Sequence, residues 1–342
     1  MSNKYLIVIL RFHGDVLLTK PMLDNIKLND PDSEIDLLVY KGTGSILEQE
    51  DNVSEIIEIE ASSKENIYKK VKKEIRLWKK INTRNYDYAF FLTTQWRVVP
   101  ISWSIGKAMK AAVDDKKRRK NLWIKSFSVI FPEALEKHII QRNLLALESL
   151  GLKIFNENLT LNPKHLEIEY KTLRDAFPFL KQESSYCLIH PTSRREKKLW
   201  DKEKFGQLIK LLLERGLPVV ITSGPDSHEI SYVEDILRKA GIVDKQVINL
   251  AGKTSLLGLA ALINRSKFFI GLDSVASHIA ASVNKESITL FGPSNPVNWK
   301  PWSDKAKIIS QEDLQKIEVD DVMVLVDESL HNKEGEIYGK KT

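Results

Sequence analysis

The chain has 342 residues, of which 42% are hydrophobic and 29% are charged; this size and composition are typical of two soluble domains. The net charge of +6 favours an anionic partner, such as a nucleic acid, an anionic membrane surface or a phosphorylated substrate. The single cysteine, Cys187, excludes a disulfide within the chain, and the apolar run around it predicts a buried thiol in a reducing compartment.

The N-terminal segment carries only six consecutive apolar residues, Tyr5–Leu10. This run is too short for a signal peptide, and no stretch approaches the roughly 20 apolar residues that cross a membrane. We therefore expect a cytoplasmic protein, with peripheral contact on the cytosolic face of a membrane as an alternative.

Short apolar, β-branched runs alternate with amphipathic stretches of helix length. The runs form two series of predicted strands, Tyr5–Leu10, Ile35–Tyr40, Ile56–Ile59 and Tyr88–Leu92, then Tyr186–His190, Pro218–Thr222, Val247–Leu250, Phe268–Leu272 and Ser287–Phe291. The stretches between them predict helices such as Lys202–Glu214, Ser231–Lys239 and Leu256–Asn264. This alternation favours an α/β fold with two Rossmann-like, doubly wound parallel sheets.

The polar stretch Asn156–Gln182 separates the two series, and its prolines Pro163 and Pro178 favour an interdomain linker. We predict domains at residues 1–160 and 183–316, a helix at 317–330 and a disordered tail at 331–342. Ligands of parallel sheets bind beyond the carboxyl ends of the strands, so we expect the two domains to face a central cleft lined by the strand exits.

The exit of the first strand carries a run of polar residues, Arg11, His13, Gly14 and Asp15. Gly14 permits a tight turn, and Asp15 falls at or near the start of the next helix. Asp15 is either a helix cap or a carboxylate that takes a proton from a substrate hydroxyl. Arg11 and His13 are either surface residues or polar groups on the floor of the cleft.

The exit of the strand Tyr186–His190 carries Thr192 and Ser193, followed by four cations within five residues. Hydroxyl and backbone N–H groups beside a lysine can hold a diphosphate. A solvated basic loop is the alternative, but it does not explain why Trp200 follows.

Two later strand exits carry acidic residues. Asp226 follows a Gly-Pro turn, where it either caps a helix or accepts hydrogen bonds from a ribose. Asp273, Ser274 and Val275 open a helix, whose free backbone N–H groups suit a pyrophosphate while Asp273 suits sugar hydroxyls. The alternative is an ordinary capped helix with His278 packed beneath it.

Several common nucleotide and metal motifs are absent from the sequence. There is no Gly-x-Gly-x-x-Gly after the first strand, no phosphate-binding loop ending in Gly-Lys-Ser/Thr and no Asp-x-Asp at a strand exit. No two of the seven histidines have a metal-ligand spacing. We therefore expect neither a metal site nor a cofactor.

The chain resembles the lipopolysaccharide heptosyltransferases of glycosyltransferase family 9 from about Leu6 to Trp302, and its motifs are most similar to the heptosyltransferase III branch. The matching motifs follow one another in order: Arg11-Phe12-His13-Gly14-Asp15-Val16-Leu17-Leu18-Thr19, His190-Pro191-Thr192-Ser193, Lys198-Leu199-Trp200, Ser223-Gly224-Pro225-Asp226, Leu250-Ala251-Gly252-Lys253-Thr254, Gly271-Leu272-Asp273-Ser274 and Leu290-Phe291-Gly292-Pro293-Ser294.

The resemblance implies a GT-B fold and an inverting, metal-independent transfer of heptose from ADP-heptose to the phosphorylated inner core of lipopolysaccharide. It implies that Asp15 is the catalytic base, and that the donor is bound by Thr192, Ser193, Lys198, Asp226, Thr254, Asp273, Ser274, Val275 and His278. It places Arg11, His13 and Gly14 on the acceptor side. The alternative is the same scaffold with another nucleotide sugar, such as an ADP- or UDP-hexose.

Two basic stretches lie in the first half, Lys69–Arg84 and Lys116–Lys120. In the first, apolar residues at helical spacing (Ile67, Val71 and Ile75 among them) predict an amphipathic basic helix. Such a helix suits an anionic membrane, here the cytosolic face of the inner membrane; a solvated helix face is the alternative. No nucleic-acid recognition fold accompanies the charge, so we do not expect nucleic acid as a partner.

Overall fold

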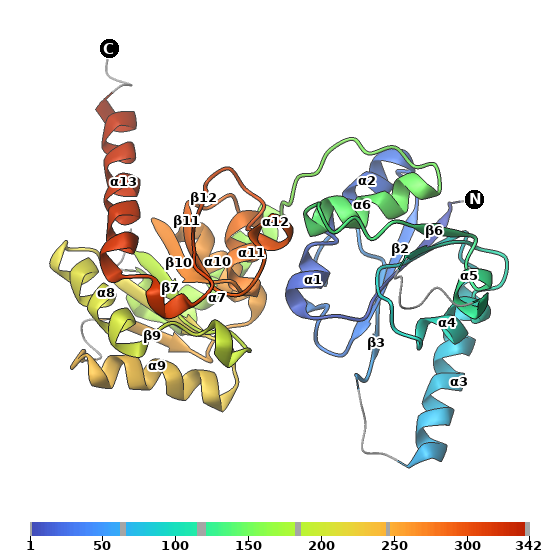
Figure 1. Ribbon diagram of the computed structural model, residues 1–342, viewed down its shortest axis with the longest axis horizontal. Coiled ribbons are helices and arrows are strands. Elements are labelled where there is room, and N and C mark those ends of the chain that lie inside the picture. Colours follow the sequence, from blue (N-terminus) through green and yellow to red (C-terminus); the bar gives the residue numbers. More distant parts are fainter. Residues whose placement is uncertain (1, 62–65, 115–120, 182–185, 244–246, 339–342) are drawn as a thin grey trace. The chain divides into compact units, whose positions relative to one another are not determined.

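The computed structural model describes residues 2–61, 66–114, 121–181, 186–243 and 247–338. The chain forms two compact units, Met1–Asn158 (unit 1) and Leu159–Thr342 (unit 2). Each unit contains a six-stranded sheet whose recorded strand pairs are all parallel (Figure 1).

Unit 1 has the strand order β3-β2-β1-β4-β5-β6. Its strands are β1 Lys4–Ile9, β2 Glu34–Tyr40, β3 Glu55–Ile59, β4 Tyr88–Phe91, β5 Met109–Val113 and β6 Val129–Phe131. Its α-helices are α1 His13–Leu17, α2 Lys20–Asn29, α3 Ile67–Arg84, α4 Val98–Ser104, α5 Asn121–Lys125 and α6 Ile139–Ser149.

Unit 2 has the strand order β12-β11-β10-β7-β8-β9, so each unit begins at the centre of its sheet and follows the strand order of a dinucleotide-binding fold. Its strands are β7 Cys187–His190, β8 Val219–Ser223, β9 Val247–Ala251, β10 Phe268–Leu272, β11 Ser287–Phe291 and β12 Ala306–Ser310. Its α-helices are α7 Pro163–Ala176, α8 Lys202–Glu214, α9 Ser227–Lys239, α10 Leu256–Arg265, α11 Val275–Ser282, α12 Pro296–Trp299 and α13 Val319–Tyr338.

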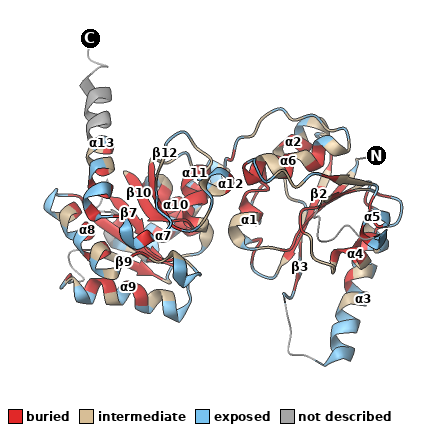
Figure 2. Cartoon of the chain, in the orientation of Figure 1, coloured by how far each residue is buried: buried red, intermediate tan, exposed pale blue. Residues whose placement is uncertain are grey.

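The central strands are buried on both faces, which explains their continuous apolar sequences (Figure 2). In β1, Leu6 and Val8 pack with side chains of α3, α4 and α5, and alternation directs Ile7 and Ile9 to the opposite face. The buried Cys187 lies in the corresponding core of unit 2, where burial raises the pKa of its thiol. The two doubly wound α/β sheets expected from the sequence are confirmed.

The expected linker Asn156–Gln182 instead contains a helix of unit 2, α7. Pro163 occupies the first turn of this helix, where a missing N–H costs nothing, and the side chain of Asn162 accepts a hydrogen bond from Lys164 N at 3.0 Å. Leu166, Tyr170 and Leu173 form its buried stripe. Proline therefore marks a helix start here rather than a linker.

Three strands were not predicted because their sequences lack a long apolar run. β5 begins with an exposed Met109, β6 has only three residues, and β12 has four half-buried residues followed by an exposed one. At the C-terminus, α13 begins close to the expected position but continues to Tyr338, through most of the predicted tail.

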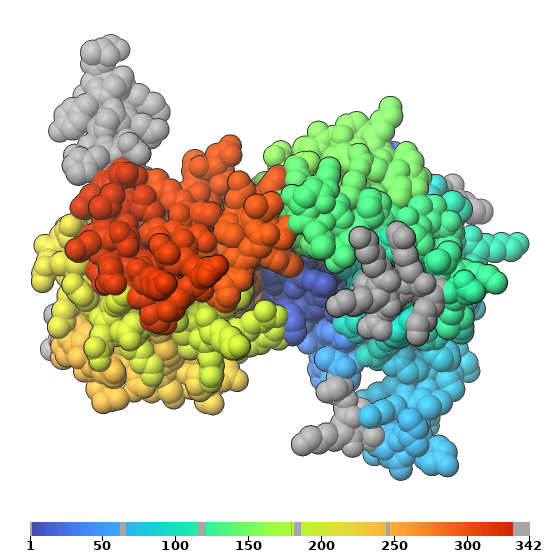
Figure 3. Space-filling view, in the orientation of Figure 1, coloured from blue at the N-terminus to red at the C-terminus, as the bar shows by residue number. Residues whose placement is uncertain are grey.

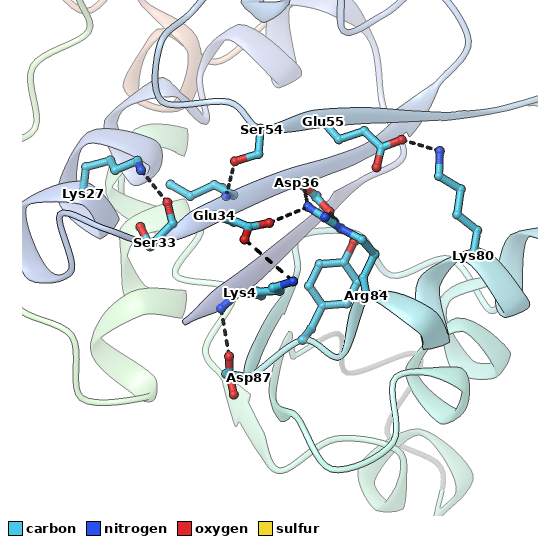
Figure 4. Close-up of polar contacts among 12 residues, drawn as sticks. Lys4, Lys27, Ser33, Glu34, Asp36, Ser54, Glu55, Lys80, Arg84 and Asp87 are labelled. Atoms are coloured by element: carbon cyan, nitrogen blue, oxygen red, sulfur yellow. Dashed lines mark hydrogen bonds and ion pairs between the residues drawn. The ribbon is translucent and has the colours of Figure 1, made fainter. Parts of the chain in front are cut away.

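An ion-pair network ties the amino ends of the strands in unit 1 (Figure 4). The Asp36 carboxylate is fully buried and accepts two hydrogen bonds from Arg84, at 2.7 and 2.8 Å, and one from the Tyr86 hydroxyl at 2.6 Å. Burial and then Asp36 raise the pKa of Tyr86, so its hydroxyl stays a donor. Glu34 joins the same guanidinium at 3.1 Å, but its side chain is 38% exposed.

We predict that Asp36→Ala lowers the free energy of unfolding by about 3 kcal/mol, because it leaves the Tyr86 hydroxyl without an acceptor and the part-buried Arg84 with only the exposed Glu34. Glu34→Ala is the matched control and should cost less than about 1 kcal/mol, since an exposed ion pair contributes little. Urea unfolding of both variants measures the difference. Equal losses would show that the buried carboxylate is not what holds this end of the sheet.

Candidate functional site

The carboxyl end of β1 in unit 1 presents Asp15. This residue lies in the first turn of α1, and the residue that precedes the helix is Phe12 rather than Asp15. The recorded contact of the Asp15 carboxylate is with Arg11 Nη1, at 3.1 Å. Its side chain is 14% exposed. The carboxylate is therefore not used as a helix cap.

Asp15 lies in a small pocket of unit 1, with a volume of about 40 Å³. Apolar residues at the ends of four strands form part of its lining: Ile9, Leu92, Val113 and Phe131. Four charged side chains also line it: Arg11, Asp15, Glu133 and Arg142. The carboxylates of this set can take a proton from a hydroxyl group, and its guanidinium groups can bind an anion.

The expected turn at Gly14 is not present, because Gly14 lies inside α1. His13 is the first residue of the same helix and is half-buried, as is Arg11. Of the three residues predicted on the acceptor side, Arg11 has a recorded contact with Asp15 and lines the pocket.

In unit 2, the strand exits bring Lys198 and Asp273 together. Lys198 Nζ lies 2.5 Å from Asp273 Oδ2, and the two side chains are 17% and 6% exposed. Lys198 ends a short 3₁₀ helix after β7, and Asp273 directly follows β10, the neighbouring strand. The ammonium has three N–H donors, so two remain for a phosphate.

The start of α11 adds backbone donors beside this ion pair. Ser274 precedes the helix and Val275 is its first residue, so the first N–H groups have no partner within the helix. Ser274 Oγ is buried and makes no hydrogen bond to any described residue. His278 is buried within the same helix, but, among the described residues, the helix lacks the side-chain cap of the capped-helix alternative. An unpartnered buried hydroxyl at a helix start is a feature that a bound anion would explain.

A buried polar chain lies under the β7 exit. The Thr192 hydroxyl donates to Glu229 Oε2 at 2.5 Å, and Gly224 N donates to the same oxygen at 3.1 Å. Because the Thr192 proton is used, its 3.3 Å contact with His190 Nε2 requires the histidine to donate. His190 Nδ1 lies 3.0 Å from the Thr222 hydroxyl. Burial lowers the pKa of His190 to about 4, against the effect of Glu229, so the ring is neutral at neutral pH.

This set of hydrogen bonds uses the Thr192 hydroxyl, one of the two donors that the sequence offered at this residue. Its side chain is fully buried and its proton is committed to Glu229, so its hydroxyl is not available to donate to a phosphate. Ser193, the next residue, is half-buried and follows the turn toward the basic segment. The Thr192 hydroxyl, which the sequence assigned to the binding of a diphosphate, therefore stabilises the loop after β7.

Asp226 caps a helix, the first of the two roles that the sequence allowed. It precedes α9, its carboxylate accepts a hydrogen bond from His228 N at 2.8 Å, and it is exposed. Thr254 is half-exposed in the turn after β9, two residues beyond Gly252, whose positive φ of 69° makes that turn possible. Neither residue touches the Lys198–Asp273 pair in any recorded contact.

Glu229 and Arg142 were missed by the sequence analysis. The pattern of a helix-capping box is present in Asp226-Ser227-His228-Glu229. This pattern predicts a local contact for Glu229, but its carboxylate accepts hydrogen bonds from Gly224 and Thr192 instead. Arg142 lies on α6 after β6, a strand too short to predict. Across the residues that the structure describes, no group of three histidine, cysteine or acidic side chains could hold a metal ion.

Sequence comparison matches most of the chain to one family of enzymes. Residues 74–324 match glycosyltransferase family 9 (heptosyltransferase). The chain is 36% identical to lipopolysaccharide heptosyltransferase 3 of Escherichia coli K12 over 295 residues, which cover 86% of this chain and 84% of that protein.

Solved structures share the fold over nearly the full chain. The glycosyl transferase family 9 protein from Veillonella parvula matches with a TM-score of 0.81 at 19% identity and covers 96% of this chain and 97% of its own. The heptosyltransferase WaaC of Escherichia coli with ADP matches with a TM-score of 0.77 at 20% identity and covers 95% and 99%. The expected GT-B-type fold is thereby confirmed. The chain belongs to glycosyltransferase family 9, the heptosyltransferases, on the heptosyltransferase III branch.

Proposed function

We propose that this protein transfers a heptose from ADP-heptose to the phosphorylated inner core of lipopolysaccharide, with inversion and without a metal ion. The proposal rests mainly on the position of the Asp15 carboxylate, which lies in a strand-exit pocket and does not cap its helix. The 36% identical relative is a lipopolysaccharide heptosyltransferase, and the structure of WaaC contains ADP; both support the choice of substrates.

In the proposed donor site, the diphosphate lies between Lys198 and the first N–H groups of α11. The ammonium and the helix start both favour negative charge, and Ser274 Oγ offers one more donor. Asp273 orients Lys198 and accepts hydrogen bonds from the sugar. The charge that develops on departing ADP is stabilised by these groups in place of a metal.

In the proposed reaction, Asp15 takes the proton of an acceptor hydroxyl. The acceptor oxygen forms a bond to the anomeric carbon as the bond from that carbon to the diphosphate breaks, and ADP leaves with the electron pair. Arg11 holds Asp15 by one N–H at 3.1 Å, so most of the carboxylate's acceptor capacity remains for the hydroxyl. The alternative donor, an ADP- or UDP-hexose, would use the same phosphate and base groups.

We also propose that unit 1 contacts an anionic membrane, at the cytosolic face of the inner membrane, through α3. This helix carries eight lysines and arginines and one glutamate. Its C-terminal half packs through Leu77 and Ile81, whereas its N-terminal turns extend beyond the body of unit 1 (Figure 3). Four apolar side chains there face solvent, with exposed fractions between 42% and 81%: Ile67, Tyr68, Val71 and Ile75.

These four side chains form one stripe flanked by cations, the pattern of a helix that lies in a membrane surface. Lys72, Arg76 and Lys79 border the same shallow groove. Each cation near an anionic surface contributes about 1 kcal/mol. No described helix is long and apolar enough to cross a membrane. The second basic stretch, Lys116–Lys120, lies outside the described residues.

We predict that Asp15→Asn lowers the rate of transfer by about 100- to 10,000-fold, the usual contribution of a general base. ADP affinity measured by calorimetry should be unchanged, because Asp15 lies in unit 1. Asp32→Asn, an exposed carboxylate in the turn before β2, is the matched control and should transfer at the wild-type rate. Full activity of Asp15→Asn would refute the base assignment.

We predict that Lys198→Ala and Asp273→Ala each weaken ADP binding by about 10-fold or more, as expected for loss of a charge-assisted contact. Because the two groups form one ion pair, the double variant should lose less than the product of the single losses. The neighbouring exposed lysine, changed in Lys197→Ala, is the control. Calorimetric affinities equal to wild type in both single variants would remove the pair from the site.

We predict that the protein sediments with anionic but not neutral vesicles at low salt, and that roughly 0.5 M salt releases it because the charges are screened. Replacing Ile67, Val71 and Ile75 with serine should weaken this binding although no charge is altered. Ile168→Ser, which removes an equally exposed apolar side chain on α7, should not. Unchanged vesicle binding of the triple variant would mean that α3 is only a solvated face.

A further inference from the structure

The side chain of Gln95 joins the ends of three neighbouring strands of unit 1. Gln95 follows β4, and its Nε2 donates to the C=O of Leu10, directly after β1, at 2.8 Å. Its Oε1 accepts from the hydroxyl of Tyr40, the last residue of β2, at 2.5 Å. Because β2, β1 and β4 are adjacent in the sheet, one amide links three successive strand exits.

The Gln95 amide takes the place of a missing backbone donor. Directly after β4, Leu92 N still donates to Val8 C=O at 2.9 Å. The C=O groups of a strand alternate in direction, so Leu10 C=O, two residues further along, points the same way, beyond the end of β4. Leu10 is 1% exposed, and a buried C=O without a partner is costly. Gln95 Nε2 supplies the partner that the sheet no longer provides.

The backbone that carries this amide is itself held in place. The C=O of Gln95 accepts from Val98 N at 3.1 Å, in the turn that starts α4. The next residue, Trp96, packs edge-on against the buried Trp123, with ring centroids 5.7 Å apart. The amide therefore extends from a fixed point, and its second hydrogen bond restrains its rotation. Satisfying one C=O would require neither feature, because a water molecule can supply a single donor.

We propose that Gln95 is a positioning residue for the proposed base, Asp15. The C=O of Leu10 and the N–H of Arg11 belong to one planar peptide group, so a fixed C=O also fixes the direction in which the chain leaves β1. Arg11 is the recorded partner of the Asp15 carboxylate, at 3.1 Å, and Asp15 lies in the first turn of the helix that follows. A displaced exit would move both groups, and a displacement of about 1 Å can cost about 100-fold in rate. This inference rests on the proposed function, because it explains how the base of that reaction is held.

The test compares wild type with Gln95→Met, which keeps the side-chain length but removes both hydrogen bonds, and with Tyr40→Phe, which removes only the second. Gln95→Met should lower kcat by about 10- to 100-fold, the cost of a misplaced reacting group. KM for the donor should be unchanged, because the proposed donor groups lie in unit 2. Tyr40→Phe should lose less, since Leu10 keeps its hydrogen-bond donor. Gln49→Met, which changes an exposed glutamine of unit 1, is the matched control and should behave as wild type.

A double variant separates positioning from a structural role. If Gln95 acts through Asp15, adding Gln95→Met to Asp15→Asn should cost nothing further, because the group that it positions is already lost. A structural role predicts the same fold-loss in both backgrounds. That additive result, or a wild-type kcat in Gln95→Met, would overturn the proposal. If Gln95→Met does not fold, Tyr40→Phe in the same two backgrounds provides the comparison.

Amide hydrogen exchange of the protein without substrates tells failure of this inference from failure of the proposed function. The Val16 amide reports on α1, because it donates to Phe12 O at 3.0 Å. Gln95→Met should speed its exchange, and Gln49→Met should not. Wild-type exchange and wild-type kcat in Gln95→Met, beside an inactive Asp15→Asn, would refute the positioning role and leave the base assignment intact. Faster exchange beside a fully active Asp15→Asn would refute the base and leave Gln95 as the restraint on the β1 exit.

Discussion

Parallel strand order is the constraint on which the rest of this molecule depends. In each unit all recorded strand pairs are parallel, so every strand in a sheet ends at the same edge. Residues far apart in sequence therefore meet: Lys198 and Asp273 are 75 residues apart and lie 2.5 Å from each other. The opposite, amino-end edge of unit 1 carries the buried Asp36 network, so stabilising charges and candidate catalytic charges lie at different ends of one sheet.

The buried polar chain in unit 2 shows how such an edge is kept in shape. Glu229 accepts from Thr192 after β7 and from Gly224 after β8, and thereby joins two strand exits through one carboxylate. A neutral His190 completes the chain, which avoids the cost of a buried charge there. These groups do not need to touch a ligand to matter, because a displaced β7 exit would carry Lys198 with it.

Most of the fold could be predicted because buried parallel strands have continuous apolar sequences, as in Tyr186–His190 and Phe268–Leu272. What could not be predicted depends on tertiary contacts. α7 was mistaken for a linker because Pro163 signals a break and a helix start equally well. The positions of the site motifs were predictable, but the partners of individual atoms were not: Thr192 was expected to donate to a ligand and donates to Glu229. Nothing in the sequence marks Arg142 as part of the pocket around Asp15, because the preceding strand, β6, has only three residues.

The proposed reaction is a single displacement at the anomeric carbon of the donor, with Asp15 as the base that activates the acceptor. The anomeric configuration of the transferred sugar tests this most directly, and NMR of the product formed from ADP-heptose of known configuration measures it. One displacement assisted by Asp15 predicts that the product linkage has the configuration opposite to that of the donor. A product with the donor's configuration would require two displacements or a different mechanism, and would contradict the account.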